Sequence, residues 1–165
     1  YKRQDFTLSE SIAILSYLED KEPKPALFGE SATERGEIWR SIMETVSYTE
    51  TSIGGFAAPI LFGQMAEKRD SAIRSRQTVE KELARVDETL NRQNYLVNDR
   101  LSAADVVLYP FVQFLSRAVA KENTEEVSGS LLDIDKYYPE LTVWCRKIEA
   151  IPGYERTYPP HWKEG

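Results

Sequence analysis

The fold of this chain depends on one stretch, Ser102-Ala103-Ala104-Asp105-Val106-Val107-Leu108-Tyr109-Pro110-Phe111-Val112-Gln113-Phe114-Leu115. Ser102 followed three residues later by Asp105 is a capping box, a pattern that begins helices, and we interpret this pair as structural rather than catalytic. The residues after it are apolar on nearly every side, so the helix must lie inside a bundle. Pro110 removes one backbone hydrogen bond at a cost of about 3 kcal/mol, which buried apolar surface offsets, so we expect a bend there.

The stretch before this central helix is also helical in pattern. Ser31 and Glu34 form a second capping box, and a helix is predicted over residues 32–50. Its apolar positions at helical spacing are Ile38, Trp39, Ile42, Met43 and Val46. The run 51–63 is either a kinked continuation or a break, because Gly54, Gly55 and Pro59 interrupt it.

Two further helices complete the predicted bundle. Residues 71–90 carry an apolar stripe with charged residues elsewhere, which indicates an amphipathic helix on a core. Pro139 begins a last helix that ends at Pro152-Gly153, and residues 154–158 are expected to form a turn. The sequence therefore predicts a mainly α protein.

The N-terminal residues follow a different pattern, with a strand reaching Tyr1, a polar turn over 2–5 and a second strand over 6–8. Glu10 and Ser11 come next, at the start of a helix over 11–18. Helix starts carry unpaired N–H groups and partial positive charge, so this place suits an anion or a zwitterion. A plain N-cap without a ligand is the alternative interpretation.

The charged, Pro-containing segment 19–25 is the expected linker between two structural units, 1–22 and 23–165. Because the chain begins without Met inside a strand pattern, we expect that it is a fragment. Its 165 residues, 41% of them hydrophobic, suffice for one substantial core.

Composition excludes several classes of protein. A formal charge of −6 and a pI near 5.0, without a basic stripe, argue against a nucleic-acid partner. The longest apolar stretch, 103–115, is shorter than the roughly 20 residues needed to span a bilayer, so no membrane association is expected. One cysteine and no signal peptide favour the cytoplasm.

Three segments in order resemble the glutathione transferase family. The first runs from Asp5-Phe6-Thr7-Leu8-Ser9-Glu10-Ser11 to Leu27-Phe28-Gly29, and the second is Leu101-Ser102-Ala103-Ala104-Asp105 with its apolar helix. The third is Tyr138-Pro139-Glu140-Leu141-Thr142-Val143-Trp144 with Ile148 to Pro152. The resemblance implies the β-β-α end of a truncated thioredoxin-like domain over 1–22, followed by the family's all-helical C-terminal domain.

The resemblance also implies an activity: glutathione as co-substrate, whose thiolate attacks a small electrophile in a homodimeric enzyme that serves detoxification. Glu10 matches the residue that holds the γ-glutamyl ammonium, and Ser11 the one that holds the α-carboxylate. The thiol-activating residue is expected upstream of Tyr1, so this chain alone is expected to be inactive, and the subclass stays open between Ser, Tyr and Cys types. A glutathione-dependent reductase or peroxidase also stays open, as does a non-catalytic assembly domain; Glu10-Ser11 favours the enzyme.

Other candidates for this site are weaker. Tyr48, Phe56 and Tyr109 are candidate walls of the hydrophobic-substrate pocket, with an ordinary core position as the alternative for each. Glu44 is a candidate for reaching glutathione across the dimer.

The remaining chemically active residues receive structural interpretations. Cys145 shares a face with Leu141 and Ile148, which indicates an inert core thiol. His161 stands without other ligand-type residues at metal-site spacing, so no metal is expected. Gly54-Gly55 lacks the pattern of a phosphate loop.

Overall fold

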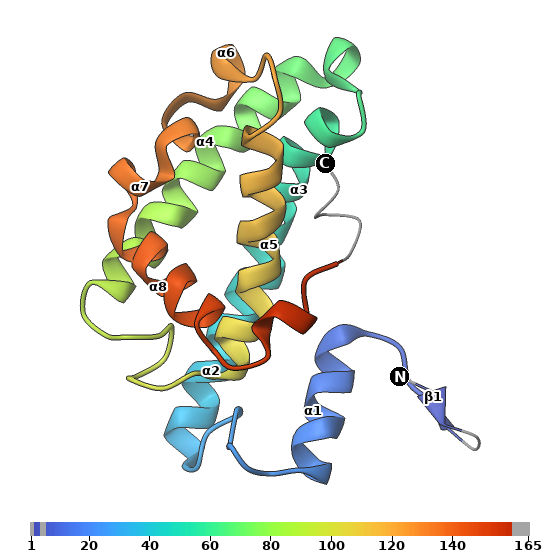
Figure 1. The fold of residues 1–165 in the computed structure, drawn as a ribbon, viewed down its shortest axis with the longest axis vertical. Coiled ribbons are helices and arrows are strands. Elements are labelled where there is room, and N and C mark those ends of the chain that lie inside the picture. Colours follow the sequence, from blue (N-terminus) through green and yellow to red (C-terminus); the bar gives the residue numbers. More distant parts are fainter. Residues whose placement is uncertain (1, 4–5, 160–165) are drawn as a thin grey trace.

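Helices dominate the computed structural model, which describes residues 2–3 and 6–159 (Figure 1). Strands β1 (Lys2–Arg3) and β2 (Phe6–Thr7) pair antiparallel, with Lys2 opposite Thr7 and Arg3 opposite Phe6. Helix α1 (Ser11–Lys21) follows them. The later elements are α2 (Ala32–Glu44), the π-helix η1 (Thr45–Thr49), α3 (Glu50–Leu61), α4 (Met65–Leu90), α5 (Ala103–Val119), α6 (Glu125–Ser128), the 3-10 helix η2 (Gly129–Asp133), α7 (Ile134–Tyr137), α8 (Pro139–Glu149) and the 3-10 helix η3 (Tyr154–Arg156). The predicted helical bundle behind a β-β-α segment is confirmed.

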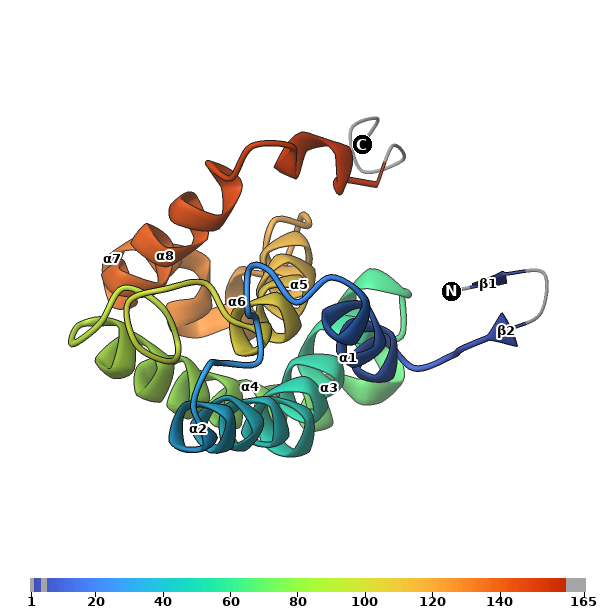
Figure 2. The same cartoon turned by 90° about the horizontal axis from the view of Figure 1, so that it is seen from below.

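Helix α5 is the centre of the bundle, as the view along it shows (Figure 2). Leu108, Val112 and Leu115 are almost completely buried in the core. One face is open, however, because Val106 is 39% exposed and Pro110 is exposed as well. The expectation that this helix is enclosed on all sides is therefore wrong for that face, although the helix does continue through Pro110.

The run of helix before α4 is longer than the sequence indicated. α2, η1 and α3 follow one another from residue 32 to 61 without a break, so the second interpretation of 51–63, a break between helices, is wrong. Ile38 and Ile42 face the core, but Trp39 is 36% exposed and Met43 is 52% exposed. Each lies one position, or about 100° of helix rotation, beyond a buried isoleucine.

Helices α4 and α8 pack as the periodicity predicted. α4 begins at Met65, before residue 71, where the helix was expected. The sequence did not reveal this earlier start, because the first turns are polar and show no apolar period. Its buried residues are Ala72, Val79, Leu83, Val86 and Leu90. In α8, the residues that enter the core are Leu141, Trp144 and Ile148. The short elements α6, η2 and α7 were not predicted, since each is too brief to show a period.

The connection between α1 and α2 corrects two expectations. Residues 19–21 belong to α1 rather than to a linker, and Lys2–Arg3 is strand rather than turn. The Glu19 carboxylate accepts hydrogen bonds from the backbone N–H of Leu27 at 3.0 Å and of Phe28 at 3.1 Å. This side chain fastens the start of the helical bundle to the end of α1. In the described ranges, no helix combines the length and apolar character required to cross a bilayer.

Candidate functional site

The N-terminus of α1, where the sequence predicts an anion site, is exposed and lacks a side-chain cap. Glu10 precedes the helix with φ 67° and ψ 116°, a left-handed φ that non-glycine residues adopt at a cost. Its side chain forms no capping hydrogen bond, and Glu10 and Ser11 are both exposed. The first intrahelical bond runs from the N–H of Ile14 to the carbonyl of Glu10 at 2.9 Å, so the preceding N–H groups lack helical partners. The alternative of a plain side-chain N-cap at Glu10 therefore finds no support.

Glu44, the second acidic candidate, is engaged within its own chain. Its carboxylate accepts from Nη1 of Arg40 at 3.1 Å and from Nη1 of Arg85 at 3.0 Å. Arg85 also pairs with Glu82, which accepts from the hydroxyl of Thr49 at 3.3 Å. These contacts join α2, η1 and α4, and a role across a dimer would have to compete with them.

The three aromatic candidates lie in three different environments. Tyr48 on η1 is 60% exposed, whereas Phe56 on α3 is fully buried. The alternative interpretation as a core residue thus fits Phe56. Tyr109 on α5 lines an apolar cavity of about 440 Å³ between α5 and the segment after α8. Leu101, Val106, Pro110 and Ile148 line it as well. A volume of this size suits a small apolar molecule.

The hydroxyl of Tyr109 belongs to a network that the sequence did not indicate. It lies 3.0 Å from Oε1 of Glu149 and 2.5 Å from the hydroxyl oxygen of Tyr154. Burial, together with Tyr154 and Glu149, raises the pKa of Tyr109 far above that of a free phenol. Since these partners lie 40 and 45 residues away in sequence, no local pattern could reveal them.

Ser102 and Asp105 have the predicted capping role and a further one. The Asp105 carboxylate accepts from N–H and Oγ of Ser102 at 2.9 Å and 2.7 Å. It also accepts from the N–H of Leu96 at 2.9 Å and from Nε1 of Trp144 at 2.8 Å. Burial raises the pKa of Asp105, although these four hydrogen bonds oppose the rise. The cap is a buried junction between α5, α8 and the preceding loop.

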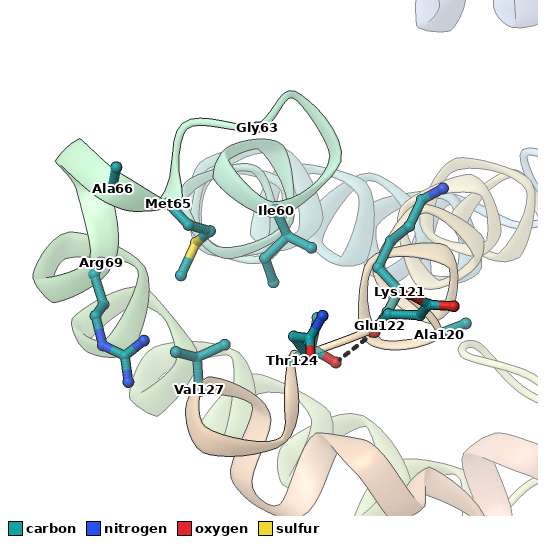
Figure 3. A pocket seen from close by; sticks show the side chains of 11 residues that line it. Ile60, Gly63, Met65, Ala66, Arg69, Ala120, Lys121, Glu122, Thr124 and Val127 are labelled. Atoms are coloured by element: carbon teal, nitrogen blue, oxygen red, sulfur yellow. Dashed lines mark hydrogen bonds between the residues drawn. The ribbon is translucent and has the colours of Figure 1, made fainter.

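A larger cavity of about 730 Å³ lies between the α3–α4 turn and the α5–α6 loop (Figure 3). Ile60, Met65 and Val127 supply apolar walls. The Arg69 guanidinium pairs with Glu126 at 2.7 Å, and the Thr124 hydroxyl donates to backbone carbonyls. None of the residues expected to bind a ligand lines this cavity.

The structure describes one of the two remaining candidates, Cys145. Within residues 2–3 and 6–159, no group of three or more His, Cys, Asp or Glu residues is arranged to hold a metal ion. Burial raises the pKa of the Cys145 thiol to about 12, which suits an unreactive side chain. His161 lies outside the described residues.

The chain is similar in sequence to one protein family and to several known proteins. The family model described as "Glutathione S-transferase, C-terminal domain" matches residues 43–152. Among curated proteins, the chain is 30% identical over 153 residues to elongation factor 1-gamma of Schizosaccharomyces pombe, covering 90% of this chain and 35% of the relative. It is 24% identical over 152 residues to a glutathione S-transferase of Emericella nidulans, covering 92% and 57%. The chain thus spans about a third and somewhat over half of these relatives' lengths.

Solved structures share the fold. A glutathione S-transferase from the Antarctic clam Laternula elliptica has a TM-score of 0.78 at 23% identity, over 99% of this chain and 69% of that one. A glutathione transferase family member from Pseudomonas fluorescens, solved with two glutathione bound, has a TM-score of 0.75 at 24% identity, over 92% and 63%. These structures show the shared fold. The family model, which matches more than half of the chain, establishes that the chain belongs to the glutathione S-transferase family and contains its helical C-terminal domain.

Proposed function

We propose that the intact protein binds glutathione at the start of α1 and transfers its thiolate to small electrophiles. The observation that carries this proposal is the backbone of Glu10, which is held at φ 67° with an exposed and uncapped side chain. Strain of this kind is retained where a side chain must be presented to a ligand. Membership of the glutathione S-transferase family also supports glutathione binding.

The chemistry of the two side chains fits the γ-glutamyl end of glutathione. The Glu10 carboxylate can pair with the α-ammonium group through charge-assisted hydrogen bonds. The Ser11 hydroxyl and the free N–H groups of the first turn of α1 can receive the α-carboxylate, which the helix dipole also favours. An acidic acceptor for the ammonium group and neutral donors for the carboxylate thus match the two charges of an amino acid.

The reaction requires a thiolate near neutral pH, although a free thiol has a pKa of about 8.5. We place the residue that stabilises this thiolate upstream of Tyr1. The apolar cavity that contains Tyr109 is proposed to receive the apolar part of the electrophile, which leaves Tyr48 and Glu44 as secondary candidates. The cytoplasm is the proposed compartment.

We also propose that residues 1–22 are the end of a larger thioredoxin-like domain. A hairpin of two short strands is marginal by itself. An apolar groove of about 320 Å³ lies between α1 and α5, lined by Ile14, Leu15, Leu18, Val106 and Phe111 among others. Further parts of that domain would cover this groove. The exposed Trp39 and Met43 on α2 offer apolar surface to a second copy in the proposed homodimer.

A non-catalytic assembly role is the second candidate. The observation in its favour is the match to elongation factor 1-gamma, which has a higher identity than the match to the Emericella nidulans transferase. In such a role the bundle would bind another protein, and glutathione would be irrelevant.

Retention on glutathione-agarose, together with a conjugation assay on the intact protein, separates the two candidates. The variant Glu10→Ala is expected to lose retention and most activity. Glu22→Ala, which removes an exposed glutamate after the other end of α1, is the matched control and is expected to retain both. If the intact protein neither binds the resin nor conjugates, the assembly role replaces the enzyme.

A further inference from the structure

The segment after α8 forms one side of the cavity that contains Tyr109. Residues 150–157 continue from the end of α8 and include η3 (Figure 2). Six of the eleven residues that line the cavity come from this segment: Ile151, Pro152, Gly153, Tyr154, Arg156 and Thr157. The shape of the cavity therefore depends on where the segment lies.

The backbone of this segment is bonded only locally. Its N–H groups reach carbonyls three or four residues away in helical turns, as from Tyr154 to Ile151 at 3.0 Å and from Arg156 to Gly153 at 3.0 Å. Of the described residues from 150 to 157, Tyr154 alone has a side-chain hydrogen bond to α5. Its ring also meets that of Tyr109 edge-on, with the ring centroids 5.8 Å apart. Tyr154 thus supplies the polar contact between this segment and α5, beside the apolar packing of Ile151 against the core.

The direction of the hydrogen bonds follows from a count of protons. An ionised carboxylate only accepts, so the hydroxyl of Tyr109 must donate to Glu149 across 3.0 Å. Because Tyr109 has one hydroxyl proton, Tyr154 must be the donor across the 2.5 Å that separates the two phenolic oxygens. The chain of bonds runs from Tyr154 through Tyr109 to Glu149, and each bond polarises the next.

We propose that Tyr154 is a positioning residue for the electrophile cavity, because its hydroxyl fastens the C-terminal segment to Tyr109 while Glu149 orients the Tyr109 hydroxyl. This inference rests on the proposed function, in which the cavity receives the apolar part of the second substrate. Tyr109 then contributes its ring, since its only proton is already donated. The hydrogen bonds from Tyr154 to Tyr109 and from Tyr109 to Glu149 hold the wall made by residues 151–157.

Hydrogen exchange in the intact protein tests the fastening independently of activity. Tyr154→Phe and Tyr109→Phe each remove the bond between the two rings and keep the apolar surface. Both are expected to speed exchange of the amides in 151–157 by about fivefold to tenfold, the loss of one hydrogen bond. Tyr137→Phe, which removes a phenol on α7 that is 53% exposed, is the matched control and is expected to change nothing there. Unchanged exchange in both cavity variants would overturn the proposal.

Two further comparisons connect the fastening to substrate. Glu149→Gln keeps an acceptor for Tyr109, so the amides of 151–157 are expected to exchange at the wild-type rate. Glu149→Ala removes that acceptor, so these amides are expected to exchange faster. In conjugation assays, Tyr154→Phe is expected to raise KM for the electrophile while KM for glutathione stays constant. Faster exchange with an unchanged electrophile KM would overturn the positioning role. An intact wild-type protein that fails to bind glutathione would instead overturn the proposed function, and the exchange result would still stand.

Discussion

Asp105→Ala is a substitution for which the structure predicts a large loss of stability. The carboxylate is fully buried and accepts four hydrogen bonds, which come from Leu96, from Ser102 twice and from Trp144. Alanine would leave three N–H groups without an acceptor, while the Ser102 hydroxyl can turn to another one. These groups belong to residues that are themselves buried, with Trp144 only 1% exposed.

The magnitude follows from these counts. Each buried donor without a partner costs about 1–3 kcal/mol. Removal of the carboxylate also relieves the cost of its burial, the same effect that raises its pKa, so the net loss lies toward the lower end of the total. We expect Asp105→Ala to lower the free energy of unfolding by about 3–5 kcal/mol, the range measured when one partner of a buried charged network is removed. Domains are commonly stable by about 5–15 kcal/mol, so this variant would lose a substantial share of its stability.

Urea unfolding followed by far-UV circular dichroism measures this difference directly. Asp99→Ala is the control, because Asp99 lies in the loop just before α5 and accepts two hydrogen bonds from Asn94 but is exposed. It is expected to lose a small fraction of what Asp105→Ala loses. Trp144→Phe, which removes one of the four donors, should fall between them. An Asp105→Ala variant within about 1 kcal/mol of wild type, the typical effect of a single substitution, would refute the reasoning.

Two further predictions concern titration. The N–H of Glu30 and then Arg100 lower the pKa of Glu34, so the stability from this carboxylate is present above its unfolded value of about 4.3 and is lost as pH falls through the folded pKa. Between pH 5 and pH 3 the wild type should therefore lose more stability than Glu34→Gln, and parallel unfolding curves for the two would contradict this. For Cys145, whose pKa burial raises to about 12, a disulfide reagent at pH 8 should react far more slowly with folded than with urea-unfolded protein. Equal rates would mean that the thiol is accessible.

The sequence predicted the helix starts and the buried faces of helices, because short local patterns determine these features. The patterns Ser31–Glu34 and Ser102–Asp105 are contained within four residues each, and both begin a helix in the structure. Ser102 and Asp105 form the complete capping box, whereas the Glu34 carboxylate accepts from the N–H of Glu30 instead of Ser31. The buried stripe of α4 repeats over many turns, so the sequence pattern predicted it as well. Glu19 could not be assigned in this way, because its carboxylate holds N–H groups of Leu27 and Phe28 that lie beyond the end of its own helix.

In the candidate site, too, residues adjacent in sequence could be predicted and contacts between distant residues could not. Glu10 and Ser11 are adjacent in sequence, so the sequence could predict an anion site at the start of α1, but it could not predict the left-handed φ of Glu10. The bonds from Tyr109 to Glu149 and Tyr154, and from Trp144 to Asp105, join residues 39 to 45 positions apart. Which polar groups meet over such separations is decided by helix packing. The same packing exposes Tyr48 and buries Phe56, two aromatics that the sequence could not distinguish.

The central claim is that Glu10 pairs with the α-ammonium group of glutathione. The most direct measurement is a calorimetric double-mutant cycle on the intact protein, which combines Glu10→Ala with a glutathione analogue that lacks this amino group. We predict that each single change weakens binding and that the two together cost little more than either alone, a coupling of about 1.5–3 kcal/mol for a hydrogen bond to a charged group. Fully additive losses, or binding that Glu10→Ala leaves intact, would contradict the claim.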